Sequence, residues 1–142
     1  MLKYTQLVLD HFKNPRNLGR IENPDAEATE GSIACGDMMT VYLKVDKDRI
    51  VDIKFESYGC AANIATASMM TEVVKGLTLS EARNLNWKDI VEKLGGLPKV
   101  KYHCSNLAVD TLRKAIDSYR SRREGPSPSE DGMEGGFSCP SN

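Results

Sequence analysis

The sequence predicts a single α+β domain in which helices pack on an antiparallel sheet. A chain of 142 residues with 40% hydrophobic and 27% charged content has the size and composition of one globular domain. A helical pattern comes first, alternating strands follow, and several helices come last, which is typical of an α+β layer rather than of a parallel α/β sheet. A short polar connector between two strands, residues 46–49, predicts an antiparallel hairpin.

The amino-terminal part of the chain is expected to form one helix and then strands. Residues 4–13 carry apolar side chains at helical spacing, and Asn, Pro and Gly residues in the segment 14–19 end that helix. Residues 40–45 and 51–56 alternate apolar and polar side chains, which is typical of strands with one buried face. A further strand is expected near residues 27–33.

The second half of the chain is expected to be mainly helical. Residues 61–75 carry small and apolar side chains at roughly helical spacing, and Gly76 follows at a stop position. Thr78 and Glu81 have the spacing of a capping box, which predicts another short helix. The remaining predicted elements are a helix capped by Asn86–Asp89, an extended segment or turn at 97–101, a last helix over 105–123, and a flexible Gly/Pro/Ser-rich tail over 124–142 that leaves 1–123 as the domain.

The charge balance and the amino-terminal sequence indicate where the protein works and which partners it lacks. The 19 Lys and Arg residues nearly balance the 20 Asp and Glu residues, so no strong net field attracts nucleic acid or an anionic membrane. The amino terminus has no secretory signal pattern, and no stretch approaches the roughly 20 apolar residues that span a bilayer. We therefore expect a cytoplasmic protein without nucleic-acid or membrane partners. In a reducing compartment, its cysteines favour metal or sulfur chemistry over disulfides.

Three of the four cysteines fall at junctions between predicted elements. Cys35 lies in a Gly-containing loop before a strand, Cys60 lies between a strand and a helix, and Cys104 follows His103 where the last helix opens. A helix amino terminus favours a thiolate by only about 0.3 to 1 kcal/mol, which is less than one pKa unit. Full ionisation therefore requires metal, which deprotonates a coordinating thiol outright.

The cysteine spacing leaves the kind of metal site open. The chain has no Cys-x-x-Cys pair, whereas structural zinc sites and ferredoxins normally carry closely paired ligands. Asp37 and His103 each lie within two residues of a cysteine, so either could be a fourth ligand. A hard carboxylate is a poor match for soft thiolates, so Asp37 would make an iron-sulfur cluster easier to release. Three thiolates with a His or Asp also satisfy zinc.

Several motifs together resemble a known family. The segments 34–37, 58–60 and 97–105 resemble, in order and context, the three cysteine motifs of the IscU/NifU family of iron-sulfur cluster assembly scaffolds. The segment 10–17 resembles that family's amino-terminal helix and turn, and the resemblance covers about residues 3–123. It implies the compact IscU type: a three-stranded antiparallel sheet with helices packed on it and the cysteines gathered at one exposed end.

The resemblance implies a carrier rather than a conventional enzyme. Such a scaffold accepts persulfide sulfur from a pyridoxal-phosphate cysteine desulfurase of the IscS/NifS type, combines it with iron into a transient 2Fe-2S cluster, and passes the cluster to apo acceptor proteins. Carried over by position, Cys35, Cys60 and Cys104 would hold the cluster, iron, or zinc in a resting form. Cys104 would also accept the persulfide, Asp37 would tune cluster lability, and His103 would be an alternative ligand.

The sequence also bears on chaperone and regulator partners and on the role of the fourth cysteine. Family members that use a dedicated Hsp70 and Hsp40 pair carry Leu-Pro-Pro-Val-Lys, whereas this chain has Lys99 at the third place, which weakens the expectation of chaperone partners. A frataxin-like regulator is a further open partner. Cys139 lies in the tail and is expected to have no role in the site.

Two other functions and several structural roles compete with the scaffold. One is a zinc module whose metal is permanent. The other is a thiol enzyme with Cys104 as nucleophile and His103 as base, which is weaker because adjacent residues at a helix start rarely aim at each other. The cysteines could also pack as small buried hydrophobes. His11 is expected to be a packing or helix-surface residue rather than a ligand.

Overall fold

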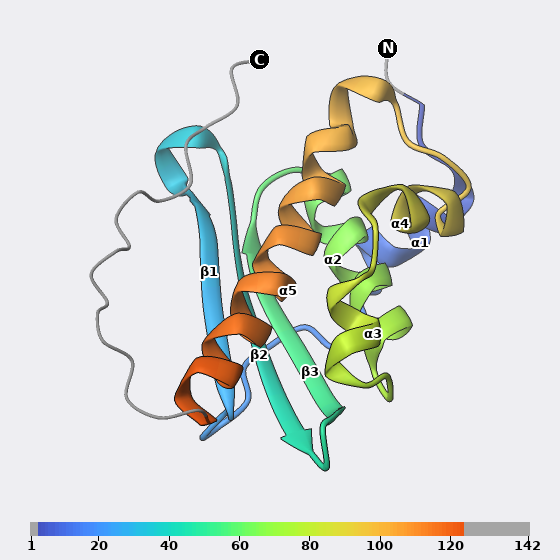
Figure 1. Cartoon of the computed structure of the whole chain (residues 1–142). Helices are drawn as coiled ribbons and strands as arrows, with labels where there is room; N and C mark the ends of the chain where they lie inside the picture. The colour runs from blue at the N-terminus through green and yellow to red at the C-terminus, as the bar shows by residue number, and fades with distance from the viewer. Residues whose placement is uncertain (1–2, 124–142) are drawn as a thin grey trace.

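The computed structural model describes residues 3–123, and of Cys35 it describes only the backbone. A three-stranded antiparallel sheet in the order β1, β2, β3 carries helices against it, which confirms the predicted fold class (Figure 1). The expected tail, with Cys139, lies outside the described residues. The elements are α1 (Gln6–Lys13), β1 (Ala26–Ser32), η1 (Ile33–Cys35), β2 (Asp37–Asp46), β3 (Arg49–Tyr58), α2 (Ala61–Val74), α3 (Leu79–Arg83), α4 (Trp87–Lys93), η2 (Lys99–Lys101) and α5 (Tyr102–Arg123), where η marks a 3₁₀ helix.

The strands β2 and β3 form the predicted hairpin. Its two turn residues, Lys47 and Asp48, both have positive φ angles, 52° and 65°, and such turns match the twist of paired strands. β2 begins at Asp37, three residues before the alternating segment, because it pairs there with the end of β1. Asp37 therefore belongs to a strand and not to the loop that the sequence suggested.

The hydrophobic core lies between the sheet and the helices. Helix α5 packs on β1 and β2, while α2 packs on β3 and against α5. Helix α2 carries small buried residues, and these let it lie close to its neighbours, as its composition predicted. The fully buried large side chains of the strands, which transfer the most apolar area out of water, are Met39, Leu43, Ile50, Ile53 and Phe55.

Short polar motifs set where the helices begin. Both capping boxes predicted from the sequence are present, one between Thr78 and Glu81 and one between Asn86 and Asp89. In the segment 97–101 the structure has the turn that was one of the two predicted forms, because Lys101 N–H donates to the Pro98 carbonyl at 2.8 Å and closes a 3₁₀ turn. Helix α5 follows directly and begins three residues earlier than predicted.

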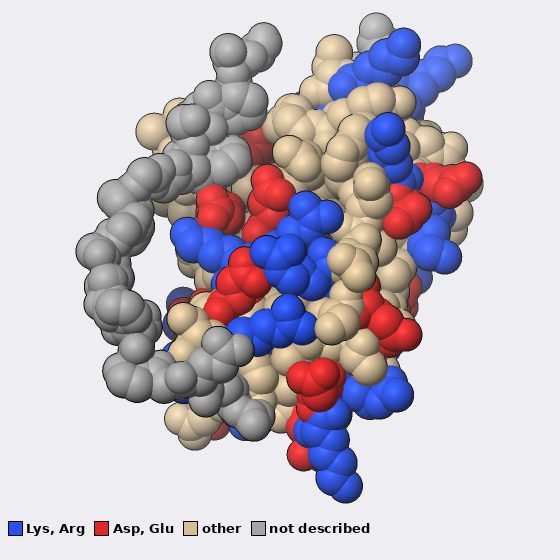
Figure 2. All heavy atoms as spheres, viewed as in Figure 1, with Lys and Arg blue, Asp and Glu red and all other residues tan. Residues whose placement is uncertain are grey.

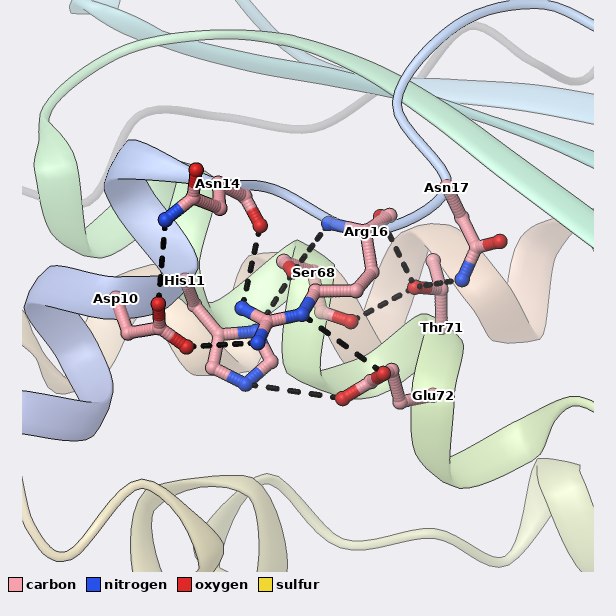
Figure 3. Close-up of polar contacts among 8 residues, drawn as sticks. All are labelled: Asp10, His11, Asn14, Arg16, Asn17, Ser68, Thr71 and Glu72. Carbon is pink, nitrogen blue, oxygen red and sulfur yellow. Dashed lines mark hydrogen bonds and ion pairs between the residues drawn. The ribbon is translucent and has the colours of Figure 1, made fainter.

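Helix α1 is held on α2 by a buried polar network (Figure 3). His11 is 3% exposed, and its Nδ1 lies 2.7 Å from Ser68 Oγ. Ser68 Oγ also accepts the Arg16 N–H at 2.9 Å, and His11 Nε2 lies 3.7 Å from Glu72 Oε1. Burial lowers the pKa of His11 and so favours its neutral form. This confirms the expected packing role of His11.

The surface carries mixed charges. Figure 2 shows Lys and Arg side chains interleaved with Asp and Glu over the visible face. Ion pairs join some of these oppositely charged side chains, for example Arg83 with Asp117 at 2.7 Å and Lys114 with Glu30 at 3.1 Å. Among residues 3–123, no helix is long and apolar enough to cross a membrane.

We expect the stability of the protein to fall in mild acid because of His11. Burial lowers the pKa of His11 from its ordinary value of 6.5, so protonation favours the unfolded chain. The contribution of neutral His11 is complete above about pH 6.5 and is lost as the pH falls through the lower folded pKa. Urea unfolding at a series of pH values should show a shallower decline for His11→Asn than for the wild type. Equal slopes would contradict this origin.

Candidate metal site

Three chain junctions meet at one end of the sheet. The register pairs Ser32 with Asp37 and Met38 with Tyr58, so the start of β2 lies beside the ends of β1 and β3. Cys60 follows β3 directly and is the N-cap of α2, as the sequence predicted. Helix α5 begins at this end too, which brings Cys104 in its first turn to the same place (Figure 1).

Two of the cysteine sulfurs are in contact. Cys60 Sγ lies 3.7 Å from Cys104 Sγ, although the residues are 44 positions apart. Cys60 is partly buried and Cys104 is fully buried, and both are free thiols. Thr66 Oγ1 supports the first turn of α5 by donating to the Cys104 carbonyl at 3.3 Å. The fold thus brings two sequence-predicted ligands together.

Asp37 and His103 complete a compact group of donors. His103 Nε2 lies 3.3 Å from Asp37 Oδ2 and 3.6 Å from Cys104 Sγ. The ligand atoms of Asp37, His103 and Cys104 all lie within 4.8 Å of one another. His103 and Cys104 therefore do approach each other, contrary to the expectation for adjacent residues at a helix start.

Three separations among these side chains are close to those between neighbouring ligands of a tetrahedral ion. With bond lengths of about 2.3 Å to sulfur and about 2.0 to 2.2 Å to nitrogen or oxygen, tetrahedral geometry separates two sulfurs by about 3.8 Å, sulfur and nitrogen by about 3.6 Å, and nitrogen and oxygen by about 3.4 Å. The observed separations are 3.7, 3.6 and 3.3 Å. Asp37, His103 and Cys104 can therefore approach one thiophilic ion together, and Cys60 lies beside them through its contact with Cys104.

The two sulfurs shift each other's pKa in opposite directions. The hydrogen bond from Cys104, opposed by burial and helped by backbone N–H groups of Asn63 and Ala62, lowers the pKa of Cys60 to about 5. The same hydrogen bond to Cys60, together with burial, raises the pKa of Cys104. The contact therefore favours the thiolate at Cys60 and the thiol at Cys104. The Cys104 sulfur lowers the pKa of Cys60 more than the backbone N–H groups at the start of α2 do.

Lys101 supplies a positive charge beside this pair. Burial is the largest single effect and lowers the pKa of Lys101, but the interactions with Cys60, Tyr4 and Cys104 together outweigh it, and the pKa rises. In return, the Lys101 ammonium helps to lower the pKa of Cys60. The sequence placed Lys101 only in the extended segment or turn at 97–101, because its nearness to Cys60 arises from the turn η2 in the folded structure.

Cys35 is described at the backbone alone. It is the last residue of η1, and the Gly36 N–H behind it closes the turn by donating to the Ile33 carbonyl at 3.0 Å. Gly36 has a positive φ of 84°, which suits the sharp passage from this turn into β2. Only Gly36 separates Cys35 from Asp37, so the backbone of Cys35 lies at the same end of the molecule.

The site also contains a residue that sequence reasoning missed. Asn63 lies in the first turn of α2, and its Nδ2 donates to Asp37 Oδ1 at 2.9 Å. The available signal was an amide side chain three residues after Cys60, in a helix otherwise dominated by small and apolar residues. A polar residue on the buried face of such a helix calls for a hydrogen-bonding partner.

The fold and the site define a small α+β domain that holds thiol, imidazole and carboxylate groups at one end of its sheet. A family model described as the NifU-like N-terminal domain matches residues 3–125. The chain is 56% identical over 116 residues to the iron-sulfur cluster assembly scaffold protein IscU 1 of Archaeoglobus fulgidus, covering 82% of this chain and 76% of that protein. It is 44% identical over 127 residues to the scaffold protein IscU of Escherichia coli K12, covering 87% and 98%.

A solved structure agrees with these sequence matches. The N-terminal part of a NifU-like protein from Brucella abortus superposes with a TM-score of 0.66 at 26% identity, covering 83% of this chain and 94% of that one. The chain belongs to the NifU-like N-terminal domain family, which confirms the resemblance seen in its motifs.

We expect Cys60 to be the more reactive thiol of the metal-free pair. A pKa of about 5 leaves Cys60 almost fully ionised at pH 7, whereas an ordinary thiol is about 3% ionised there. Iodoacetamide labelling followed by peptide mass spectrometry should modify Cys60 before Cys104, at a rate that is flat from pH 8 to pH 6 and falls near pH 5.

Removal of the partner sulfur provides the control for this labelling. In Cys104→Ala, Cys60 loses its strongest hydrogen-bond donor, so the fall in its labelling rate should move to higher pH. An unchanged pH profile in that variant would show that Cys104 does not set the ionisation of Cys60.

Proposed function

We propose that this protein is a scaffold on which iron-sulfur clusters are assembled and from which they are passed on. The observation that carries the proposal is the convergence of Cys60, Cys104, His103 and Asp37 at ligand spacing at one end of the sheet. Relatives that are 56% and 44% identical bear the name of iron-sulfur cluster assembly scaffold. A scaffold is a carrier and needs ligands that can both hold and release its cargo.

In this proposal, Cys35, Cys60 and Cys104 hold a transient 2Fe-2S cluster, and His103 or Asp37 supplies the remaining ligand. The contact between the Cys60 and Cys104 sulfurs and the nearness of Lys101 support this assignment, because they favour negative charge where a metal binds. Asp37 introduces a hard oxygen donor into a soft sulfur set, which makes the assembled cluster easier to release. Zinc, which accepts the same donors, is proposed for a resting form.

Sulfur would enter as a persulfide from a cysteine desulfurase, with Cys104 as the acceptor. Cys104 Sγ would bond to the terminal sulfur as the desulfurase cysteine leaves as a thiolate, and the Cys104 proton would pass to Cys60. The contact between the two sulfurs supports this proton transfer. Because Cys104 is fully buried, the first turn of α5 would have to open for the desulfurase to reach it.

The partners in this proposal are the desulfurase and apo iron-sulfur proteins that accept the cluster. Val100 is 66% exposed beside the site and Lys99 is exposed too, so η2 offers a docking segment with apolar and basic character. Because Lys99 departs from the motif of chaperone-dependent members, Hsp70 and Hsp40 remain the weaker predicted partners. A frataxin-like regulator also remains a prediction. The cytoplasmic location also stays a prediction.

A permanent zinc module is the second candidate function. It is favoured by one observation, three interatomic distances that are close to those between neighbouring ligands of a tetrahedral ion. The two candidates differ in ligand exchange, because a structural zinc site keeps its metal whereas a scaffold gives up its cargo.

Anaerobic reconstitution tests the scaffold directly. With ferrous iron, cysteine and a cysteine desulfurase, we expect sulfur-to-iron charge-transfer absorption to appear and then to move to an added apo-ferredoxin. Cys35→Ala, Cys60→Ala and Cys104→Ala should each lose most of the absorption, while Cys139→Ala should form the cluster normally. Tightly held zinc without any cluster would reject the scaffold in favour of the zinc module.

Replacing Asp37 should make the cluster more persistent. Asp37→Ala removes the hard donor, so we expect cluster absorption to decay several-fold more slowly during transfer to apo-ferredoxin. Glu22→Ala, which removes an exposed carboxylate outside the site, is the matched control and should transfer at the wild-type rate. Faster loss of the cluster from Asp37→Ala would overturn the proposed role of Asp37.

A further inference from the structure

Asn63 is a buried amide that bonds a site carboxylate. Its side chain is fully buried in the first turn of α2. Its Nδ2 donates to Asp37 Oδ1 at 2.9 Å and to the Tyr58 carbonyl at 3.3 Å. Within residues 3–123, its Oδ1 has no hydrogen-bond partner. A buried acceptor without a partner costs free energy, so the amide lowers stability at one end while it bonds a carboxylate at the other.

The Asp37 carboxylate is held by a different group at each oxygen. Asn63 donates to Oδ1, while Oδ2 faces His103 Nε2 at 3.3 Å. The side chain of Asp37 is 22% exposed, so it is largely enclosed but open on the site side. A carboxylate fixed at one oxygen cannot rotate freely and presents the other oxygen in a constant direction. Hydrogen bonds of this kind orient metal ligands in proteins.

The backbone around this contact leaves no room for a side chain at position 59. A Cβ added to Gly59 would clash with Asn63 Nδ2 and would lie 2.5 Å from Asp37 Oδ1. Glycine therefore allows the end of β3 to pass close to both groups. The contact between Asn63 and Asp37 is enclosed by the junction that also positions Cys60.

We propose that Asn63 is a positioning residue that fixes Asp37 so that its Oδ2 is directed at the metal. The proposal rests on the proposed function, in which Asp37 is a ligand of the site. Asn63 itself touches no metal in this arrangement, because its donor group is occupied by Asp37 Oδ1 and the Tyr58 carbonyl. It controls how firmly the carboxylate takes part in binding a divalent ion.

A double-mutant cycle with Co²⁺ tests this role. Cobalt alone is added to the reduced, metal-free full-length chain, and its visible absorption reports the ligand set while competition with a chelator gives the affinity. We expect Asn63→Ala to weaken Co²⁺ binding by about 10-fold or more, the range for loss of a group that orients a ligand. Asp37→Ala should weaken binding at least as much, and the double variant should match Asp37→Ala.

A matched loss of stability separates positioning from a structural role. Asn63→Ala leaves Asp37 Oδ1 and the Tyr58 carbonyl without this donor and empties a buried volume, so the variant should unfold at a lower urea concentration than the wild type. Thr71→Ala is the matched control, because Thr71 is also fully buried and polar in α2 but bonds Ser68 and Arg16 instead. It should lower stability and leave Co²⁺ affinity unchanged.

The outcomes distinguish failure of this inference from failure of the proposed site. Weaker binding in Asp37→Ala with unchanged binding in Asn63→Ala would overturn the positioning role and leave Asp37 as a ligand. Equal losses for Asn63→Ala with and without Asp37 would overturn it too, because Asn63 would then act independently. Unchanged Co²⁺ binding and absorption in Asp37→Ala would overturn both roles, whereas cluster reconstitution tests the scaffold function separately.

Discussion

The antiparallel register of the sheet is the constraint on which the site depends. It pairs Met38 with Tyr58, so the first residues of β2 and the last residues of β3 lie side by side at one end of the sheet. Asp37 and Cys60 lie at the same end of the sheet because a strand start and a strand end are neighbours in any antiparallel pair. A slip of one residue would turn Asp37 to the other face of the sheet and away from His103. The pattern of buried residues along β2 and β3 prevents such a slip.

The site combines features that favour binding with features that favour release. The contact with Cys104 favours the thiolate at Cys60, and Lys101 stabilises that charge, so the metal-free protein already carries a thiolate. Against this, Asp37 contributes a hard oxygen, and the two turns that enter the site, η1 and η2, are 3₁₀ segments of three residues each. Such segments have poorer hydrogen bonds than an α-helix. Among the candidate ligands, Cys35 lies in one of these segments, whereas Asp37 lies on β2 and His103 and Cys104 lie in α5.

Buried polar side chains serve two separate purposes in α2. Toward the amino-terminal helix, Ser68 bonds His11 and the turn at Arg16, which anchors α1 on the domain. Toward the site, Asn63 bonds Asp37 and Thr66 bonds the Cys104 carbonyl. The small residues of α2 between these polar side chains allow close packing. Helix α2 therefore connects the residues that hold α1 to the candidate metal ligands. The spacing of these polar residues follows the helical repeat of α2, and the residues that face α1 and those that face the site are all buried.

The sequence by itself determined the α+β class, the β2–β3 hairpin, both capping boxes and the family, because alternation, turn residues and cysteine motifs are local patterns. The tertiary structure alone decided which atoms meet: the contact between Cys60 and Cys104 spans 44 positions, and that between Asp37 and His103 spans 66. It also decided the earlier start of α5 and the bond from Asn63. These depend on how α5 and α2 cross the sheet, and the free energy of packing side chains from distant segments fixes that crossing.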